Sequence, residues 1–168
     1  MKLLTALGVS IAILAAILIF IEWGLGLIGF QPIAITSWVC FVAWACFYAA
    51  GGKKEGLLKT LAANTAGAIV GFLIILLMGL LGFLGHPTAL AIAVLVGAFV
   101  LVVQANWSVL SFIPAAFAGC ASAFGSGGAG DFQLLIMCIL SLWVGALFGI
   151  ASEIWGNAMA KKDPPAAE

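Results

Sequence analysis

Long apolar runs fill most of the chain and are separated by short breaks of polar residues, glycine or proline. A helix needs about 20 apolar residues to cross the ~30 Å hydrocarbon core of a bilayer. The pattern therefore predicts six membrane-spanning helices. They are residues 3–28, 33–50, 57–84, 87–104, 107–125 and 132–155. Together they predict a single membrane domain over residues 1–160, followed by a flexible cytoplasmic tail at 161–168.

The composition excludes a soluble monomer. Hydrophobic residues make up 65% of the 168 residues and charged residues only 7%, whereas a soluble domain is about half apolar and about a quarter charged. The chain cannot cover a globule of its own size with polar surface, so the lipid bilayer is its expected partner. Its few basic residues form no stripe that could neutralise phosphates, and we expect no nucleic-acid partner.

The positions of the lysines predict the direction of the spans. Basic residues of membrane proteins concentrate on the cytoplasmic side. With six spans and both termini in the cytoplasm, all lysines lie at or near that side, namely Lys2, Lys53, Lys54, Lys59, Lys161 and Lys162. A model with five spans would divide them between the two sides, so the pattern favours the even number.

The two halves of the chain resemble each other at an offset of about 77–81 residues. The segment GAIVG at 67–71, for example, parallels GALFG at 145–149. We interpret residues 3–84 and 87–156 as two repeats of three spans each. Because three is odd, the second repeat enters the membrane upside down. The predicted fold is an all-α polytopic membrane protein with a 3+3 inverted-topology repeat, an arrangement found in many transporters with the site at the repeat interface.

Small residues recur at helical spacing within the predicted spans. Gly67 and Gly71 lie one turn apart, as do Gly145 and Gly149. Such ridges let helix backbones approach closely in lipid. The alternative interpretation is that small side chains leave width for a pore.

Candidate pore-lining or solute-binding residues lie in the predicted spans and are aromatic, polar or helix-breaking. Asn64 is the deepest polar residue, and an unpaired amide in hydrocarbon costs several kcal/mol. It must therefore bond to another helix or line a polar cavity. Pro114 lacks an N–H group and is expected to kink or interrupt the fifth span. The full set is Trp44, Phe47, Asn64, Ser111, Pro114, Phe117 and Phe124.

Three ionisable residues, Glu22, His86 and Asp131, are candidates for gating or proton coupling. An ionisable group inside a span is costly and suggests function, but Glu22 and Glu153 also lie where a carboxylate can reach solvent or cap a helix. Asp131 either caps the last span, where it favours the helix dipole, or attracts cations. His86 is either a solvated loop residue or a pH sensor.

Catalysis, cofactors and metal binding are not expected. The chain offers no paired carboxylates and no serine or cysteine beside a histidine base in the spans. Its four cysteines have no metal-ligand spacing. The glycine-rich segment GSGGAGD at 125–131 lacks the lysine and hydroxyl residue of a phosphate-binding loop.

The remaining function classes are transport and assembly. Ion pathways usually need charged rings or carbonyl filters, which this chain does not offer. We therefore expect a channel or facilitator for a small, mostly neutral solute of the size of urea, ammonia, a short amide or a weak acid. A homo-oligomer is expected for a chain of 17.2 kDa. The alternatives are a non-transporting assembly or regulatory subunit and a proton-coupled transporter.

Several motifs of the second half resemble a known family. They are LSFIP at 110–114, Gly130-Asp131 and GxxFGxA at 145–151. This pattern is similar to that of the YcdZ-like small bacterial inner-membrane proteins, a domain of unknown function. The resemblance implies a bacterial inner-membrane location and a compact multi-span fold. It implies no activity and no catalytic or binding residue.

Overall fold

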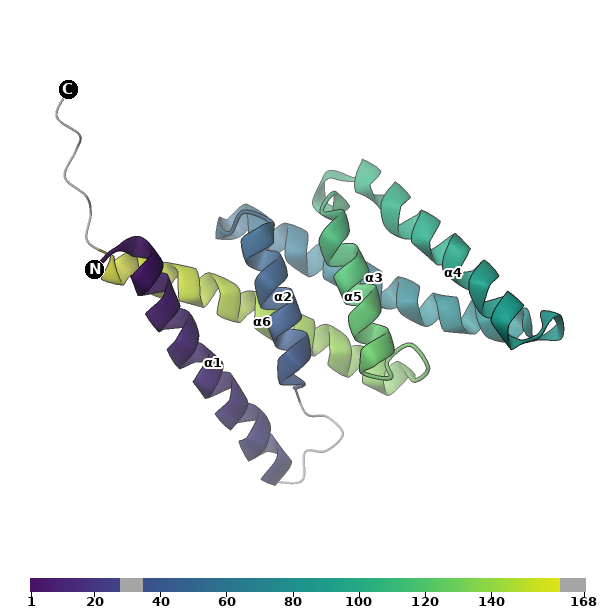
Figure 1. Ribbon diagram of the computed structural model, residues 1–168, viewed down its shortest axis with the longest axis horizontal. Helices are drawn as coiled ribbons and strands as arrows, with labels where there is room; N and C mark the ends of the chain where they lie inside the picture. Colours follow the sequence, from purple (N-terminus) through teal and green to yellow (C-terminus); the bar gives the residue numbers. More distant parts are fainter. Residues whose placement is uncertain (28–34, 161–168) are drawn as a thin grey trace.

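The computed structural model describes residues 1–27 and 35–160 (Figure 1). The predicted tail at 161–168 lies outside these residues, as do the predicted break at 29–32 between the first two spans and the neighbouring residues 28, 33 and 34 of those spans. The described part is built from α-helices and short 3-10 turns and contains no strand, which confirms the predicted all-helical class.

Six α-helices follow one another along the chain. They are α1 (Leu3–Leu27), α2 (Ser37–Ala49), α3 (Lys53–Leu80), α4 (His86–Val103), α5 (Ile113–Gly125) and α6 (Phe132–Met159). Three 3-10 turns, at Gly82–Leu84, Gln104–Asn106 and Ser108–Leu110, flank α4 and precede α5. Four helical segments are long and apolar enough to cross a membrane: Leu3–Leu27, Lys53–Leu80, His86–Asn106 and Phe132–Met159.

Helices α2 and α5 are shorter than the sequence predicts. Each has 13 residues, which at 1.5 Å per residue is about 20 Å of helix and less than the ~30 Å hydrocarbon core. The predicted span at 107–125 fails at its start, because Trp107 is extended and Ser108–Leu110 is a 3-10 turn. Apolar content alone does not distinguish such a turn from a helix, and within the segments predicted as spans at 33–50 and 107–125 the α-helices begin only at Ser37 and Ile113.

The helices pack in two groups, each around one long helix. In the α3 group, α4 and α5 pack against α3; in the α6 group, α1 and α2 pack against α6. Figure 1 shows α2 and α5 crossing the long helices. The two groups meet where α3 contacts α6 and where α2 contacts α3 and α5. We call this contact between the groups the seam.

Glycines set the closest helix approaches inside each group. A Cβ atom at Gly67 of α3 would collide with the main chain of Ala116 in α5, and one at Gly145 of α6 would collide with the main chain of Cys40 in α2. Only residues without a side chain allow backbones to come so near, which increases van der Waals contact in lipid. The predicted packing role of these small residues is confirmed.

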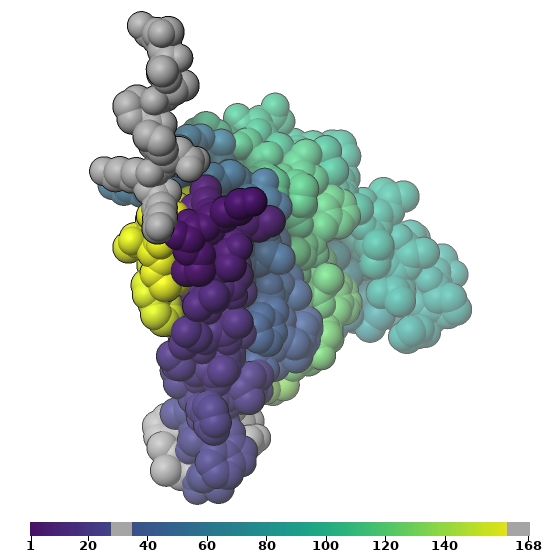
Figure 2. Space-filling view, turned by 60° about the vertical axis from the view of Figure 1, so that its left-hand side comes forward, coloured from purple at the N-terminus to yellow at the C-terminus, as the bar shows by residue number. Residues whose placement is uncertain are grey.

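The start of α1 lies beside the end of α6. Ser10 Oγ donates a hydrogen bond to the Ser152 carbonyl oxygen at 2.8 Å, and Figure 1 shows the N-terminus next to the last turns of α6. The loop after α2 reaches the same end, where the Lys53 N–H donates to Glu153 Oε2 at 2.7 Å. In Figure 2, α1 stands in front of the other helices, while the turn from α3 to α4 projects on the far side.

Candidate functional site

The seam is lined mainly by small buried side chains. Its central cluster joins four helices and contains Val39, Ala43, Ala68, Ala123, Ala129, Leu135, Cys138 and Leu142. Ala68 brings one face of α3 into this cluster. Residues that lie one and two turns earlier on the same face of α3 are Asn64 and Thr60, because side chains four positions apart are neighbours on a helix.

Asn64 and Thr60 are fully buried and carry polar atoms without partners. Among the described residues, no group forms a hydrogen bond with Asn64 Oδ1, Asn64 Nδ2 or Thr60 Oγ1. Ser122 of α5 has an equally isolated buried hydroxyl. Buried polar groups almost always have a partner. Of the two alternatives predicted for Asn64, the interhelix hydrogen bond is therefore not present in the described structure.

A hydrogen-bond node centred on Ser152 joins the three helices of the α6 group. Trp44 Nε1 donates to Ser152 Oγ at 3.1 Å, and Tyr48 OH lies 2.8 Å from the same oxygen. Ser152 Oγ donates to the Gly149 carbonyl at 2.7 Å, and Ser10 reaches the Ser152 carbonyl as described above. We call these residues the serine node, and they fix the start of α1 and the end of α2 against α6.

Sequence reasoning missed Ser10 and Ser152 in the serine node. The available signal was the row of small residues on α6, in which Ser152 falls between Gly149 and Gly156 on the buried face. A serine in such a row faces a neighbouring helix, where its hydroxyl can bond across the interface.

The aromatic candidates lie in two different places. Trp44 and Phe47 are buried in the α6 group, where Trp44 belongs to the serine node and the Phe47 ring packs on Gly149. Phe117 and Phe124 are 43% and 40% exposed and line an apolar pocket of about 190 Å³ beside Ile74. The structure therefore does not gather the four aromatics into one constriction.

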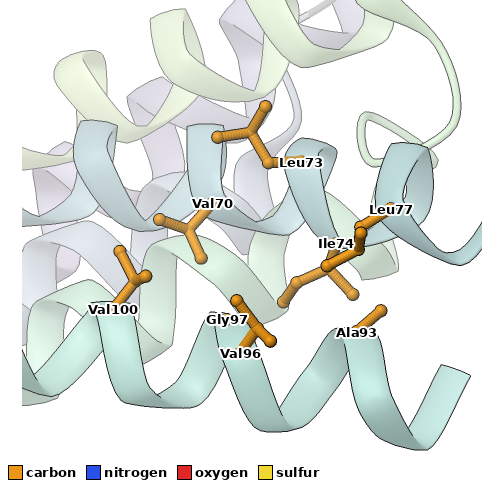
Figure 3. Close-up of a pocket in the computed structure, with 8 residues that line it drawn as sticks. All are labelled: Val70, Leu73, Ile74, Leu77, Ala93, Val96, Gly97 and Val100. Atoms are coloured by element: carbon orange, nitrogen blue, oxygen red, sulfur yellow. The ribbon is translucent and has the colours of Figure 1, made fainter.

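A second apolar pocket lies between α3 and α4. It has a volume of about 120 Å³, and Figure 3 shows its aliphatic lining, with Val70 and Ile74 on α3 facing Gly97 on α4. No polar side chain lines it. Both pockets of the α3 group thus offer apolar contact rather than hydrogen bonds.

Pro114 and Ser111 lie where α5 begins. Pro114 stands in the first turn of α5, where a missing N–H removes no helix hydrogen bond. The predicted kink is therefore wrong, while the predicted interruption of the 107–125 segment is confirmed. Ser111 is exposed, and its Oγ donates to the Ser108 carbonyl at 2.7 Å within the preceding turn.

The carboxylates near helix ends act as caps. Asp131 Oδ1 accepts from the N–H groups of Gln133 at 2.7 Å and Leu134 at 3.0 Å, which confirms the predicted cap of the last helix. Glu153 caps a different helix, because it accepts from the Lys53 N–H at the start of α3. This bond links the α3 group to the α6 group.

The other ionisable candidates lie on α1 and α4. Glu22 is partly buried in α1 and lines a surface pocket of about 410 Å³ with Trp23 and Gly26. His86 is exposed at the first residue of α4, just before Pro87. In residues 1–27 and 35–160, no group of three or more His, Cys, Asp or Glu side chains could hold a metal ion.

Comparison with known proteins places this architecture among membrane proteins. A family model described as "Protein of unknown function (DUF1097)" matches residues 8–157. The uncharacterized protein YahC of Escherichia coli (strain K12) is 31% identical over 161 residues, covering 94% of this chain and 93% of that protein. Inner membrane protein YcdZ of Salmonella typhimurium (strain LT2) is 30% identical over 172 residues, covering 96% and 92%. YcdZ of Escherichia coli (strain K12) is 29% identical over 170 residues, covering 96% and 93%. No solved structure matches the chain.

Proposed function

The chain belongs to the DUF1097 family and is a multi-pass protein of the bacterial inner membrane, and from this premise we propose that it is a facilitator for a small, mostly neutral solute. The resemblance to YcdZ-like proteins that the motifs indicated is confirmed by these relatives. The family carries no assigned activity, so the proposal rests on the arrangement of this chain's own residues.

An inverted repeat is part of the proposal. Two features support it: α3 and α6 each have 28 residues, and α2 and α5 each have 13. In addition, Gly67 meets Ala116 as Gly145 meets Cys40. The partners in these two contacts are 78 and 76 positions apart along the chain. The long helix of each repeat would thus pack against the short helix of the other repeat.

The proposed orientation places both termini in the cytoplasm. Lys53 lies beside Glu153 near the end of α6, and the end of α6 lies beside the start of α1, which carries Lys2 next to it. The lysines at these positions therefore gather at one end of the molecule. This clustering is what the positive-inside rule expects of a cytoplasmic end.

The observation that carries the proposal is the pair of unpartnered buried residues on the seam face of α3. Asn64 and Thr60 offer hydrogen-bonding atoms that no described residue uses. A polar group kept at this depth without a partner is costly, so it indicates a ligand that the helices do not supply. The buried polar set of the described residues holds hydroxyl and amide side chains but no charged one, which favours a neutral solute over an ion.

The proposed path runs along the seam between the α3 group and the α6 group. Within each group, backbone contact at Gly67 or Gly145 leaves no room for a solute. Between the groups, the contact is made by the small side chains of the central cluster, with Ala43 and Ala68 at the α2 and α3 sides. For a solute to pass, the two groups would therefore have to separate slightly from each other, while the helices within each group stay together.

Flux measurements test this proposal. Purified protein is reconstituted in liposomes, and solute entry is followed by stopped-flow light scattering for urea, acetamide, glycerol and acetic acid. We expect at least one solute to enter faster than in empty liposomes of matched size and lipid. Entry at the rate of empty liposomes for every solute contradicts the proposal.

A proton-coupled carrier is a second candidate, favoured by Glu22. Its carboxylate is partly buried in a helix long enough to span the membrane, and it lines a surface pocket beside Trp23. A carrier of this kind would lose its dependence on a pH gradient in the variant Glu22→Gln. If solute flux through the parent protein does not depend on a pH gradient, the proton-coupled carrier is contradicted.

An assembly role is a third candidate, favoured by the outer face of α1. Most large apolar residues of this helix, among them Phe20 and Trp23, are exposed, and a second copy or another membrane protein could cover them. Purification in mild detergent tests it. A stable homo-oligomer or hetero-complex that shows no flux would favour assembly, and a monomer with solute flux would exclude it.

A further inference from the structure

We propose that Asn64 and Thr60 form a binding site for a small primary amide or a urea-type solute. This inference rests on the proposed function and specifies its solute. Asn64 lies one turn before Ala68, the α3 residue of the central cluster, and Thr60 lies one turn nearer the start of that helix. Both side chains are fully buried, and three of their polar atoms have no partner among the described residues.

The chemistry of the Asn64 side chain selects the solute class. A carboxamide presents a carbonyl oxygen that accepts and an NH₂ group that donates, side by side in one plane. A primary amide or urea presents the same pair, so the two can meet through two parallel N–H···O bonds. A polyol has no planar donor and acceptor pair to match, and a carboxylate has no donor. The Thr60 hydroxyl adds one group that can both donate and accept.

The position of Asn64 is fixed by backbone packing. A Cβ atom at Gly119 of α5 would collide with the Asn64 main chain, so α3 and α5 are held together at this level. A site whose backbone is fixed in this way presents its side chain in a defined place and loses little entropy on binding. The carboxamide can therefore act as a preformed recognition group when the seam opens.

The opposite half of the seam carries no such group. Within the proposed repeat, Thr60 and Asn64 correspond to Cys138 and Leu142, each 78 positions later. Cys138 and Leu142 are buried in the central cluster and are apolar. At these two pairs of positions the α3 residues are polar and the α6 residues are apolar, so the amide site is expected once per protein rather than twice.

Two variants and a matched control test the site. Asn64→Leu installs the residue of the opposite half, and Thr60→Val removes one hydroxyl with little change of shape. Thr88→Val is the control, because Thr88 is exposed in the first turn of α4, which lies outside the seam. Flux of urea, acetamide and glycerol is measured for each protein in liposomes.

We expect Asn64→Leu to reduce urea and acetamide flux by about tenfold, since two hydrogen bonds to the solute are lost. Thr60→Val is expected to reduce the same fluxes by about threefold, because it removes one bond. The glycerol flux and all fluxes of Thr88→Val are expected to remain at parent values. Amide flux that is unchanged in Asn64→Leu while the parent protein conducts overturns the amide site but leaves the facilitator intact.

A stability measurement provides a test that does not depend on flux. Replacing an unpartnered buried amide by leucine removes a desolvation penalty. We therefore expect Asn64→Leu to raise the temperature of thermal unfolding in detergent, measured without solute. A lower unfolding temperature would mean that the Asn64 side chain is bonded to the protein, and would overturn the proposed site. Absence of flux in the parent protein for every solute refutes the proposed function itself.

Discussion

The α6 group and the α3 group share a shape but are held together by different chemistry. In the α6 group, Ser152 receives hydrogen bonds from two helices and so fixes α1 and α2 in defined positions. In the α3 group, Ile74 stands 78 positions before Ser152 and packs instead against the Gly97 backbone and other apolar residues. In the proposed repeat these two residues occupy equivalent positions, so the position is polar in the α6 group and apolar in the α3 group.

Helices can therefore pack closely in lipid either through hydrogen bonds, as in the α6 group, or through apolar contacts, as in the α3 group. Lipid tails are as apolar as leucine, so helices associate through van der Waals contact and hydrogen bonds rather than through the hydrophobic effect. Hydrogen bonds are directional and fix a single arrangement. Apolar contacts tolerate small shifts, so we expect α4 to move more readily against α3 than the start of α1 moves against α6.

The largest effect is expected where both groups depend on the same device. Gly67→Ala and Gly145→Ala each force a Cβ atom into the main chain of a neighbouring helix, which cannot turn aside. We expect each to reduce stability by about 3 kcal/mol or more, seen as loss of the monodisperse peak in size-exclusion chromatography. Gly79→Ala on α3 is the control, because nothing lies within 4 Å of the added atom. Normal behaviour of both variants would contradict the two-group packing.

A smaller effect is expected from the serine node. Ser152→Ala leaves the Trp44 indole N–H and the Tyr48 hydroxyl without their partner in a buried site. We expect a loss of about 2 kcal/mol, measured as a lower thermal unfolding temperature in detergent. Ser111→Ala is the matched control, since Ser111 is exposed and bonds only within its own turn. Equal unfolding temperatures for the two variants would mean that the node does not hold the α6 group.

The caps of the two long helices are expected to contribute about equally. Asp131→Ala removes the cap of α6, and Glu153→Ala removes the cap of α3. A lost cap costs about 1 kcal/mol, which is measurable as a change in unfolding temperature. Glu153 belongs to the α6 group, as the serine node does, although it caps α3. If the cap and the node act independently, the stability losses of Glu153→Ala and Ser152→Ala should add in the double variant. Full stability of both single variants would contradict the capping roles.

The smallest effect is expected in the apolar group. A Cβ atom at Gly97 would collide with Cγ1 and Cδ1 of Ile74 and touch Cγ1 of Val70, which are side-chain atoms and can shift more easily than a main chain. We expect Gly97→Ala to cost under about 1 kcal/mol, and the double variant with Ile74→Val to recover part of the loss. A loss as large as that of Gly67→Ala would mean that the α3–α4 contact is rigid, and the proposed difference between the groups would not hold.

The features that the sequence predicted well are those with a local signal. Apolar length marked the four long helices, and Asp131 was predicted as a cap because a carboxylate just before a helix bonds the free N–H groups. The four-residue spacing of small residues, from Gly67 to Gly71 and from Gly145 to Gly149, predicted close packing. A backbone contact between helices excludes every larger residue at these positions.

The remaining features depend on contacts between distant parts of the chain. Ser10 and Ser152 are 142 positions apart, and nothing near either residue shows that they meet. The short length of α5 was missed because the segment before Pro114 is mostly apolar without being α-helical. The cap that Glu153 provides for α3 was likewise invisible, since a carboxylate that caps a distant helix has no sequence signature.

The proposed inverted repeat requires the two halves of the chain to lie in the membrane in opposite directions on either side of a shared seam. Labelling of single introduced cysteines with a membrane-impermeant maleimide in intact cells tests it directly, because the four native cysteines are buried. Lys54→Cys places a thiol at an exposed position in the first turn of α3, and Gly130→Cys places one at an exposed position between α5 and α6. We expect Gly130→Cys to react in intact cells and Lys54→Cys to react only after the cells are permeabilised. Reaction of both variants from the same side would contradict the claim.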